Sequence, residues 1–238
     1  MCLVDLTYPT PEENLAADEA LLDACEDGGS AALRFHEPAS FFVVVGFGNR
    51  VATEVNEPAC AAAGVPVLRR VSGGGTVLLG PGCLAYALAM PISDEPEFES
   101  VSGTNRLVMD RNRAAIERCS GKTTEICGHT DLAIGGLKFS GNAQRRRRRA
   151  LLFHGTILLC ADLAAIGRYL RAPSREPDYR RGRDHAAFVT NLGVDASVVK
   201  AALAEAWSAR EPYSAPLGPR MGTLLVERYR RAEWHARL

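Results

Sequence analysis

Three short groups of residues in this sequence have the types and spacing that acyl or phosphoryl chemistry requires. The first is the segment RRVSGGGT at 69–76, in which two arginines precede three consecutive glycines between apolar runs. Successive backbone N–H groups in such a turn form an anion-binding concavity, and arginine binds phosphate or carboxylate in a bidentate manner. Its spacing fits neither the dinucleotide-binding nor the P-loop pattern. The segment is therefore an anion site or, alternatively, a tight β-hairpin beside a solvent-facing arginine pair.

The second group surrounds Lys138, in the segment GGLKFSGNA. Leu137 and Phe139 flank the lysine, so in a half-buried strand these two residues face one way and Lys138 the other. A lysine in such a place either extends to water or points into a cleft toward a negative charge. The small polar residues at 140–142 continue the strand and leave space beside it, which favours the cleft.

The third group is the triplet His154, Gly155 and Thr156 in an apolar run. The histidine would either polarise an acyl carbonyl or complete a hydrogen bond in the core. Small residues here leave a slot for an eight-carbon acyl chain, since each buried CH₂ contributes about 0.8 kcal/mol.

The elements that must position these groups follow from hydrophobic periodicity and from glycine and proline. Helices are expected over 13–26, 104–118, 161–171 and 195–209, a strand within 41–49, a strand–turn–strand unit over 65–79, and a strand over 83–91. A β-meander is expected over 130–159, with a Gly-Gly turn at 135–136 and an arginine-rich loop at 145–149, and a polar loop over 172–190. Together they predict one α+β domain over 1–238, with a mixed, largely antiparallel sheet flanked by helices.

Composition narrows the functional class. Lys plus Arg equal Asp plus Glu at 28 each, so no overall field favours nucleic acid or a membrane surface. Seven dispersed cysteines, none in a CxxC pair, argue against a zinc site or a disulfide framework. No basic-then-apolar leader or long apolar run is present, so a reduced, cytoplasmic protein is expected, without a tightly bound cofactor.

Taken together, the three groups resemble the signature blocks of the lipoate-protein ligase A family, within the biotin and lipoate ligase superfamily. The matching segments are RRVSGGGT at 69–76, TDLAIGGLKFSGNAQ at 130–144 and FHGTILL at 153–159. Weaker matches occur in the same order at NLAADEALL, VVVGFGN and FVTNL, so the resemblance covers about 12–195. It implies the α+β catalytic fold that this superfamily shares with class II synthetases.

The resemblance also implies a two-step reaction with ATP, Mg²⁺ and lipoate or octanoate as co-substrates. Lipoate attacks the α-phosphate of ATP, and the acyl group of lipoyl-AMP then passes to a lysine of a lipoyl carrier, either a 2-oxoacid dehydrogenase lipoyl domain or a glycine cleavage H-like protein. It assigns Lys138 to the acyl carbonyl and phosphate and Asp131 to Mg²⁺. Substrate and ATP contacts are assigned to Arg70, Ser72, Gly73, Gly74, Gly75, Thr76, Val77, Leu78, Gly141, His154, Gly155 and Thr156.

Some features depart from the family pattern or leave alternatives open. Thr130 precedes Asp131 where the family has asparagine, which puts one metal or phosphate contact in doubt. The stretch after about 210 is too short for the accessory C-terminal domain of many bacterial ligases, so a small partner subunit is expected, or only part of the reaction. The polar loop over 171–184 corresponds to the family's lid over the adenylate. The run Arg145–Arg149 is either a solvated loop tip or a docking patch for an acidic lipoyl domain.

Two rival functions remain. An octanoyltransferase would carry its acyl group on a cysteine, and Cys127, four residues before Asp131, is the cysteine nearest to the required place. It lies closer to the Lys138 strand than the transferases' nucleophile does, so a buried structural cysteine is the preferred interpretation. The other rival is a non-catalytic lipoyl- or cofactor-binding protein, against which the retained Arg70, Lys138 and Asp131 argue.

Overall fold

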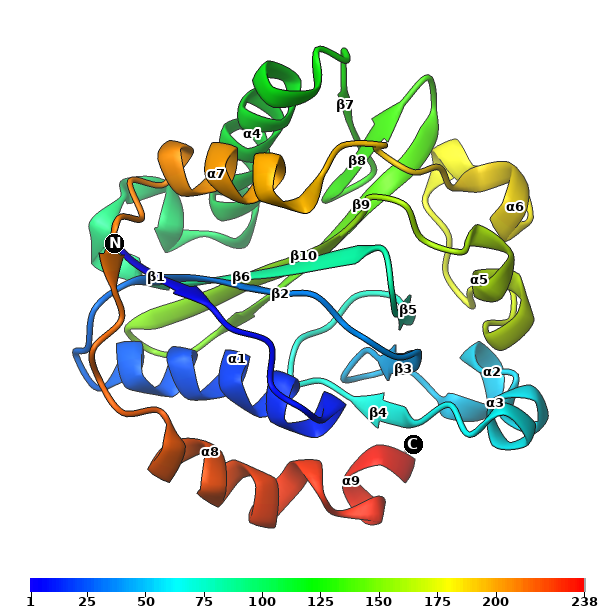
Figure 1. Cartoon of the computed structure of the whole chain (residues 1–238), viewed down its shortest axis with the longest axis horizontal. Coiled ribbons are helices and arrows are strands. Elements are labelled where there is room, and N and C mark those ends of the chain that lie inside the picture. The colour runs from blue at the N-terminus through cyan, green and yellow to red at the C-terminus, as the bar shows by residue number, and fades with distance from the viewer. Residues whose placement is uncertain (238) are drawn as a thin grey trace.

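An eight-stranded sheet forms the centre of the computed structural model, which describes residues 1–237 (Figure 1). Its strand order is β11-β1-β2-β6-β10-β9-β8-β7, parallel where β1 meets β11 and β2 and antiparallel elsewhere. The strands are β1 (Cys2–Asp5), β2 (Ala32–His36), β6 (Cys83–Pro91), β7 (Glu125–Cys127), β8 (Asp131–Ile134), β9 (Leu137–Arg146), β10 (Ala150–Leu158) and β11 (Glu211–Pro212). The sheet is mixed and largely antiparallel, as the sequence predicts.

A smaller sheet has the order β4-β3-β5. Its strands are β3 (Phe42–Val45), β4 (Val67–Arg69) and β5 (Val77–Leu79). The central β3 pairs in parallel with β4 and antiparallel with β5, so the glycine-rich segment between β4 and β5 crosses over β3. The alternative of a tight β4–β5 hairpin is therefore wrong, because β3 lies between the two strands.

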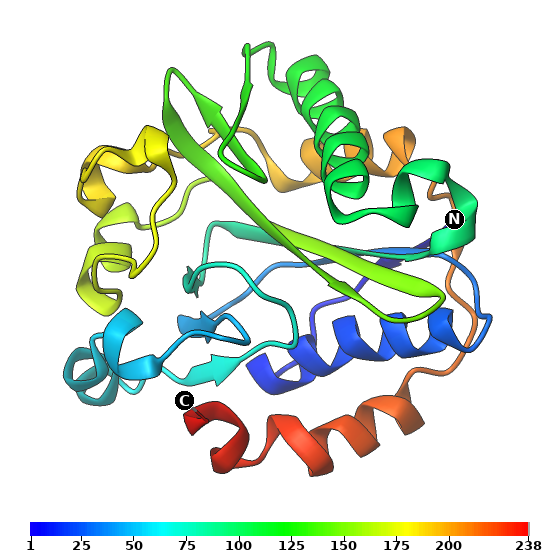
Figure 2. The same cartoon turned by 180° about the vertical axis from the view of Figure 1, so that it is seen from behind.

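Helices cover both faces of the large sheet. The helices of the described residues are α1 (Pro11–Glu26), α2 (Val51–Glu54), α3 (Glu57–Ala63), α4 (Val101–Ser120), α5 (Leu163–Tyr169), α6 (His185–Phe188), α7 (Ala196–Ala206), α8 (Gly218–Leu224) and α9 (Ala232–Ala236), and α2, α3, α5 and α6 lie toward the small sheet. Short 3₁₀ turns occupy η1 (Ile92–Asp94), η2 (Pro96–Glu99) and η3 (Asp178–Arg180), and a π-helical turn, η4 (Leu225–Tyr229), extends α8. Both views show α4 and α7 on one face and α1, α8 and α9 on the other (Figures 1 and 2).

The core is divided by these layers. One apolar cluster lies between the large sheet and α4 and α7, and includes Phe139 and Phe153. A second lies under α1 and α8, where Ala16, Ala17 and Ala20 pack closely against the sheet. A third joins the small sheet to α3 and α5. The apolar faces of both sheets are therefore buried under helices, as expected for a layered domain.

Local signals explain where the key elements begin and end. Helix α1 starts at Pro11 because Thr10 forms a capping box with Glu13, whose carboxylate accepts from the Thr10 N–H at 3.0 Å. Gly135 and Gly136, with φ of 56° and 74°, make the turn between β8 and β9. The predicted arginine loop begins later than expected, because Arg145 and Arg146 belong to β9. Among residues 1–237, no helix is long and apolar enough to span a membrane.

Candidate active site

The glycine turn over 72–76 packs against a second glycine-containing turn at Gly46–Asn49. A Cβ on Gly46 would overlap the carbonyl oxygen of Gly74, and Asn49 Nδ2 donates to that same oxygen at 3.1 Å. Gly74 has φ of +84°, and a Cβ there would lie 3.3 Å from the Ala143 methyl group of β9. The turn therefore needs glycine both for its backbone angles and for close approach to β9.

Arg70, expected to face an anion, turns its guanidinium into the glycine turn. Its Nη2 donates to the carbonyls of Gly73 and Gly75 at 2.6 and 2.7 Å, its Nη1 to Val44 at 3.3 Å, and its Nε to Ser72 Oγ at 2.9 Å. Burial lowers the pKa of Arg70 to about 10, which still leaves it charged at neutral pH. In this structure the cation shapes the turn, and contact with a bound anion would require some of these bonds to be exchanged.

Lys138 faces a carboxylate. Its Nζ lies 2.7 Å from Asp131 Oδ1, and the other Asp131 oxygen accepts a hydrogen bond from Tyr179 Oη at 2.8 Å. Gly141 makes room for the lysine, because a Cβ there would lie 2.7 Å from Nζ. Lys138 on β9 and Asp131 on β8, both predicted site residues, therefore lie together. The short stretch Gly141–Ala143 of β9 lies between this pair and the glycine turn, because Gly141 adjoins Lys138 and Ala143 adjoins Gly74.

His154 lies at the centre of a buried polar network. Its Nε2 is 2.5 Å from Ser72 Oγ, and its Nδ1 is 3.5 Å from Asp18 Oδ2, at the outer limit of a hydrogen bond. Because Arg70 Nε donates to Ser72 Oγ, the serine hydroxyl is free to donate to Nε2. The network therefore favours the tautomer with its proton on Nδ1, facing Asp18.

Asp18 in turn pairs with Arg34, whose Nη1 lies 2.6 Å from Asp18 Oδ1 and 3.2 Å from His36 Nδ1. Burial alone would raise the pKa of Asp18, but Arg34 and the hydrogen bond to His154 hold it well below its usual range. Ser72, Arg34, His36 and Asp18 are all buried. The glycine turn, β10 and α1 are thus joined by a charged network beneath the surface.

Gly155 and Asn142 meet across β9 and β10. A Cβ on Gly155 would overlap the Asn142 side chain, whose Oδ1 accepts from Tyr86 Oη at 2.5 Å. Tyr86 Oη accepts from Asn112 Nδ2 at 2.9 Å, and the Asn112 oxygen accepts from Trp207 Nε1 at 2.7 Å. This chain of hydrogen bonds links the strand that carries Lys138 to α4 and to the end of α7.

The segment over 172–190 lies against the Lys138 strand. Arg183 Nη2 donates to the Gly136 carbonyl at 3.1 Å, and the Thr190 N–H donates to the Lys138 carbonyl at 2.9 Å. The Tyr179 and Phe188 rings pack with centroids 5.1 Å apart. The segment expected as a polar loop therefore contains η3 and α6, and Tyr179 joins it to Asp131.

The remaining predicted residues lie on or directly before β5, β8 and β10 beside these groups, except that Leu78 is buried in the cluster between the small sheet, α3 and α5. Thr76 Oγ1 accepts from Asn49 Nδ2 at 3.4 Å, and Val77 and Leu78 begin β5 directly after the turn. Thr156 pairs with Gly141 across β9 and β10. Thr130, the departure from the family pattern, donates from Oγ1 to the Asn142 carbonyl at 2.8 Å, so it braces β9.

Cys127 pairs with Asp131 in the β7–β8 ladder and lies near Glu125. Burial and the carboxylates of Glu125 and Asp131 raise the pKa of the Cys127 thiol. A nucleophilic cysteine needs a lowered pKa, usually beside a cation or histidine. The surroundings of Cys127 raise the pKa of its thiol instead, which disfavours the nucleophilic thiolate.

The arginine run at the β9–β10 turn is mostly engaged within the protein. Arg146 Nη1 donates to Thr104 Oγ1 at 3.1 Å, and Arg147 Nη2 lies 2.9 Å from Asp23 Oδ1 on α1. The Arg145 guanidinium lies over the Phe47 ring. Only the side chains of Arg148 and Arg149 are exposed within the run. The run is therefore not solvated throughout, since its exposed part is centred on Arg148 and Arg149, and docking of an acidic lipoyl domain on it stays a prediction.

The donor set at Asp131 fits a metal ion only in part. Within residues 1–237, no group of three or more His, Cys, Asp or Glu side chains is placed to hold one. Asp131 is a single carboxylate, and both of its oxygens already have partners. Mg²⁺ commonly uses one or two carboxylates together with phosphate oxygens and water. The site thus fits Mg²⁺ as an ion shared with a phosphate ligand, not as an ion caged by protein.

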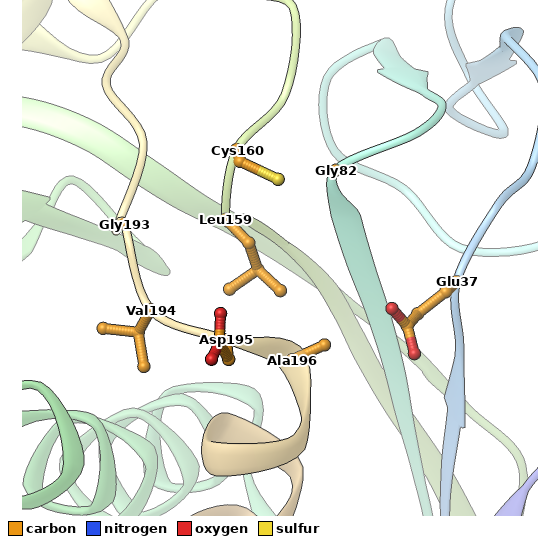
Figure 3. Close-up of a pocket in the computed structure, with 8 residues that line it drawn as sticks. All are labelled: Glu37, Gly82, Leu159, Cys160, Gly193, Val194, Asp195 and Ala196. Carbon is orange, nitrogen blue, oxygen red and sulfur yellow. The ribbon is translucent and has the colours of Figure 1, made fainter.

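Two surface hollows, each of about 290 Å³, lie away from Lys138. One, shown in Figure 3, is bordered by Glu37, Gly82 and Cys160 and by the start of α7 at Asp195 and Ala196. The other lies between α4 and the β7–β8 turn, near Met109 and His129. Neither is lined by the glycine turn, Lys138 or Asp131.

Sequence reasoning missed several residues that hold the predicted site in place, among them Asp18, Asn49, Tyr86, Asn142 and Tyr179. Asp18 had one available signal, since it lies in the NLAADEALL block as an acidic residue among buried alanines. Tyr179 lies in the segment expected as the lid, but its contact with Asp131 spans 48 positions, so no local pattern marked this particular residue.

Comparison with known proteins gives a consistent family. The sequence model of the lipoyl protein ligase A/B catalytic domain matches residues 10–206. A protein assigned as lipoate-protein ligase A in Aeropyrum pernix is 33% identical over 167 residues, which cover 70% of this chain and 60% of that protein. Octanoyltransferase LipM of Carboxydothermus hydrogenoformans is 30% identical over 201 residues, covering 76% of this chain and 72% of that protein. The chain thus spans less than two thirds of the Aeropyrum relative.

Solved structures show the same fold. A lipoate protein ligase from Thermoplasma acidophilum with bound lipoic acid superposes with a TM-score of 0.85 at 22% identity, covering 100% of this chain and 99% of that one. A lipoate-protein ligase A bound with ATP gives 0.84 at 23% identity, covering 99% and 98%. The α+β architecture predicted from the sequence is confirmed.

Proposed function

Because the chain belongs to the lipoyl protein ligase A/B catalytic-domain family, we propose that it activates lipoate with ATP and transfers the lipoyl group to a lysine of a lipoyl-carrier domain. The observation that carries this proposal is the convergence of Lys138, Asp131 and the glycine turn around Gly141–Ala143. An amino group and backbone N–H donors fixed around one small-residue strand suit a reaction in which two anions must meet.

In the first step, a carboxylate oxygen of lipoate attacks the α-phosphorus of ATP. The bond to the bridging oxygen breaks, and pyrophosphate leaves with its electron pair. Lys138 would leave Asp131 in part to face the acyl and phosphate oxygens, where its charge offsets the charge that develops. Gly73, Gly74, Gly75 and Thr76 would supply backbone N–H groups, and Mg²⁺ held by Asp131 would neutralise phosphate charge.

In the second step, the amine of the carrier lysine attacks the acyl carbonyl, AMP leaves, and the nitrogen loses a proton. His154, fixed by Ser72 and Asp18, would orient the acyl group. The segment over 171–184 would act as the lid, because Tyr179 already contacts the residue proposed to hold the metal ion. Water would then be kept from the adenylate while it waits for the carrier.

The acceptor and the second subunit in this proposal are taken from a structurally similar ligase. Thermoplasma acidophilum has a bipartite lipoate protein ligase studied with its E2 lipoyl domain, and its structure superposes on this chain with a TM-score of 0.85 at 23% identity. We take from it a lipoyl-domain acceptor and the need for a small second subunit as parts of the proposal. The 1–238 chain would then be the catalytic half of the system.

The direct test mixes the purified chain with ATP, Mg²⁺ and lipoate and measures pyrophosphate release, with and without a lipoyl domain. Expected is lipoate-dependent pyrophosphate and, with the carrier and any required subunit, a carrier mass raised by one lipoyl group. No lipoate-dependent pyrophosphate under any of these conditions, together with no lipoyl transfer, would refute the ligase.

A second candidate function is octanoyl transfer from an acyl carrier protein, favoured by the similarity to LipM proteins. The raised pKa of Cys127 argues against that residue as the acyl carrier. Mass analysis after incubation with octanoyl-acyl carrier protein separates the two functions. An acyl adduct that disappears in Cys127→Ser would establish the transferase, whereas unchanged ligase activity in the same variant would exclude a role for this thiol.

A further inference from the structure

The C-terminal segment folds back along the molecule and ends beside the small sheet. Helices α8 and α9 are joined by η4, and α8 runs along α1 while α9 lies beside β4, as Figure 1 shows. Residues after 206 lie outside the region matched by the family, so the proposed mechanism does not use them. Much of this segment packs on α1, and its hydrogen bonds to the residues beside the glycine turn converge on Arg69.

The backbone of Arg69 is bonded by two side chains of α9. Strand β4 is an edge strand, so its outer N–H and C=O groups have no neighbouring strand. The Arg69 N–H donates to His235 Nδ1 at 2.9 Å, and Trp234 Nε1 donates to the Arg69 carbonyl at 2.9 Å. Two side chains thus take the place of a strand partner at this position.

The guanidinium of Arg69 joins the segment to the turn at Gly46–Asn49. It is fully buried and donates to the carbonyls of Gly46, Phe47 and Asn49 at 2.9, 3.2 and 2.7 Å. It also donates to the carbonyls of His235 and Arg237 at 3.1 and 2.6 Å. None of the described carboxylates forms an ion pair with it, so these carbonyls alone compensate a buried charge, which is costly if they are lost.

Aromatic packing adds a third connection. The Phe47 and Trp234 rings have centroids 6.0 Å apart, and the Arg237 guanidinium lies 4.4 Å from the Phe47 centroid and 5.1 Å from that of Trp234. The Gly46–Asn49 turn is therefore held from one side by the C-terminal segment.

The opposite side of the same turn touches the glycine turn. Asn49 Nδ2 donates to the Gly74 carbonyl, and the Phe47 N–H donates to the Ser72 carbonyl at 2.9 Å. Gly46 approaches Gly74 too closely for any side chain. A displacement of the Gly46–Asn49 turn must therefore alter the backbone of residues 72–74.

We propose that Arg69, Trp234 and His235 form a C-terminal latch whose role is to position the glycine turn for ligand binding through the Gly46–Asn49 turn. The three are positioning residues, since none of them contacts the site at Lys138. This inference rests on the proposed function for its ligand, ATP, but its structural part can be tested without any ligand.

The first experiment compares amide hydrogen exchange in the parent chain, Trp234→Ala and His235→Ala. Expected is exchange faster by about tenfold or more in residues 46–49 and 70–76, with protection in α4 and β10 unchanged. His235→Asn, which keeps an acceptor near Nδ1, should restore much of the protection. Glu233→Ala, an exposed change on the same helix, serves as the matched control. Unchanged exchange in these turns, or an equal rise throughout the chain, would overturn the latch.

The second experiment measures pyrophosphate release in the same variants. The latch predicts a KM for ATP raised by about tenfold or more with kcat changed by less than about threefold, because lost positioning weakens binding of the nucleotide. A lower kcat with unchanged KM would contradict it. If the parent chain releases no pyrophosphate and transfers no lipoyl group under any condition of the direct test, second subunit included, the proposed function fails, and the exchange data alone decide the latch.

Discussion

Lys138 is the residue on which the proposed chemistry depends most, and its substitution is the sharpest test at this scale. Lys138→Ala should lower adenylate formation by about 100-fold or more, since removal of one fixed electrostatic group commonly costs that much. Lipoate binding should be largely kept, because burial of the apolar acyl chain is expected to supply most of its binding free energy. Pyrophosphate release and calorimetric titration with lipoate measure the two quantities.

The unfolding temperature of Lys138→Ala controls for misfolding, since the substitution leaves Asp131 with only Tyr179 as partner. Equal loss of lipoate binding and adenylate formation would contradict a role for Lys138 in the chemical step. Full activity would remove this lysine from the mechanism.

His36 predicts a pH-dependent stability. Burial lowers the pKa of His36 to about 3, and Arg34 and His154 add to this effect while Asp18 opposes it. In the unfolded chain His36 is protonated below about pH 6.5, whereas in the native state it stays neutral down to about pH 3. The free energy of unfolding is therefore unaffected by His36 above pH 6.5 and decreases as the pH falls from 6.5 toward 3. The slope of about 1.4 kcal/mol per pH unit amounts to about 2 kcal/mol at pH 5.

Urea unfolding at pH 7, 6 and 5 measures this effect of His36. His36→Gln should flatten the dependence over that range, whereas His129→Gln, at an exposed position, should leave it as in the parent chain. If the parent and His36→Gln lose stability in parallel, His36 is not the group responsible.

At the residue scale, the sequence predicts which residues lie near one another in the candidate site, but not which hydrogen-bond or ion-pair partner each of them has. Lys138, Asp131, His154 and the glycines could be singled out because each lies in a short motif. In the structure Lys138 contacts Asp131, and His154 contacts the glycine turn at Ser72. The engagement of Arg70 with carbonyls of its own turn could not be predicted, because a motif does not reveal which acceptors surround a guanidinium. The contact of Tyr179 with Asp131 could not be predicted for a similar reason, since the two residues are distant in sequence.

At the scale of elements, the β9–β10 turn gives a test with a built-in control. Arg147 pairs with Asp23 and Glu19 on α1, whereas the neighbouring Arg148 is exposed. Arg147→Ser should lower the free energy of unfolding by about 1 kcal/mol, because Glu19 is buried and would lose one of its cationic partners. Arg148→Ser should change it by less than about 0.5 kcal/mol. Denaturant unfolding compares the two, and equal effects would contradict the assignment.

Elements with strong periodicity or clear boundaries were predictable, and those lacking such signals were not. Helix α1, the Gly-Gly turn and the β6, β9 and β10 strands lie close to their expected positions. Strands β1 and β2 were missed because they are short and β2 contains Arg34 and His36, whose burial depends on pairing with each other and with Asp18. The C-terminal helices were missed because their stability comes from packing on α1 and β4.

For the molecule as a whole, strand order was the part least accessible to sequence. The glycine segment reads locally as a hairpin, yet β3 separates its two strands. A hairpin and a crossover have the same local pattern, and only long-range pairing distinguishes them. The consequence is functional, because the crossover carries the glycine turn out of the small sheet and onto β9 of the large sheet.

Ligand binding should therefore stabilise the molecule as a unit. Lys138 and Asp131 belong to the large sheet, the glycine turn to the crossover of the small sheet, and Tyr179 to the segment that contacts both residues. A ligand that contacts all three parts at a concentration of 100 Kd would add about 2.7 kcal/mol. For a chain of this length, the unfolding temperature would rise by about 5–10 °C.

Calorimetry with lipoate, with octanoate, with a non-hydrolysable ATP analogue and Mg²⁺, and with lipoate and the analogue together tests this coupling. A ligase should respond to the nucleotide and to the acid, and most strongly to both. A shift with octanoate and none with the nucleotide would instead favour the transferase, because acyl transfer from a carrier needs no phosphate site. Lys138→Ala should reduce the extra gain from the pair while keeping the response to lipoate, since the lysine lies where the acyl and phosphate groups are expected to meet.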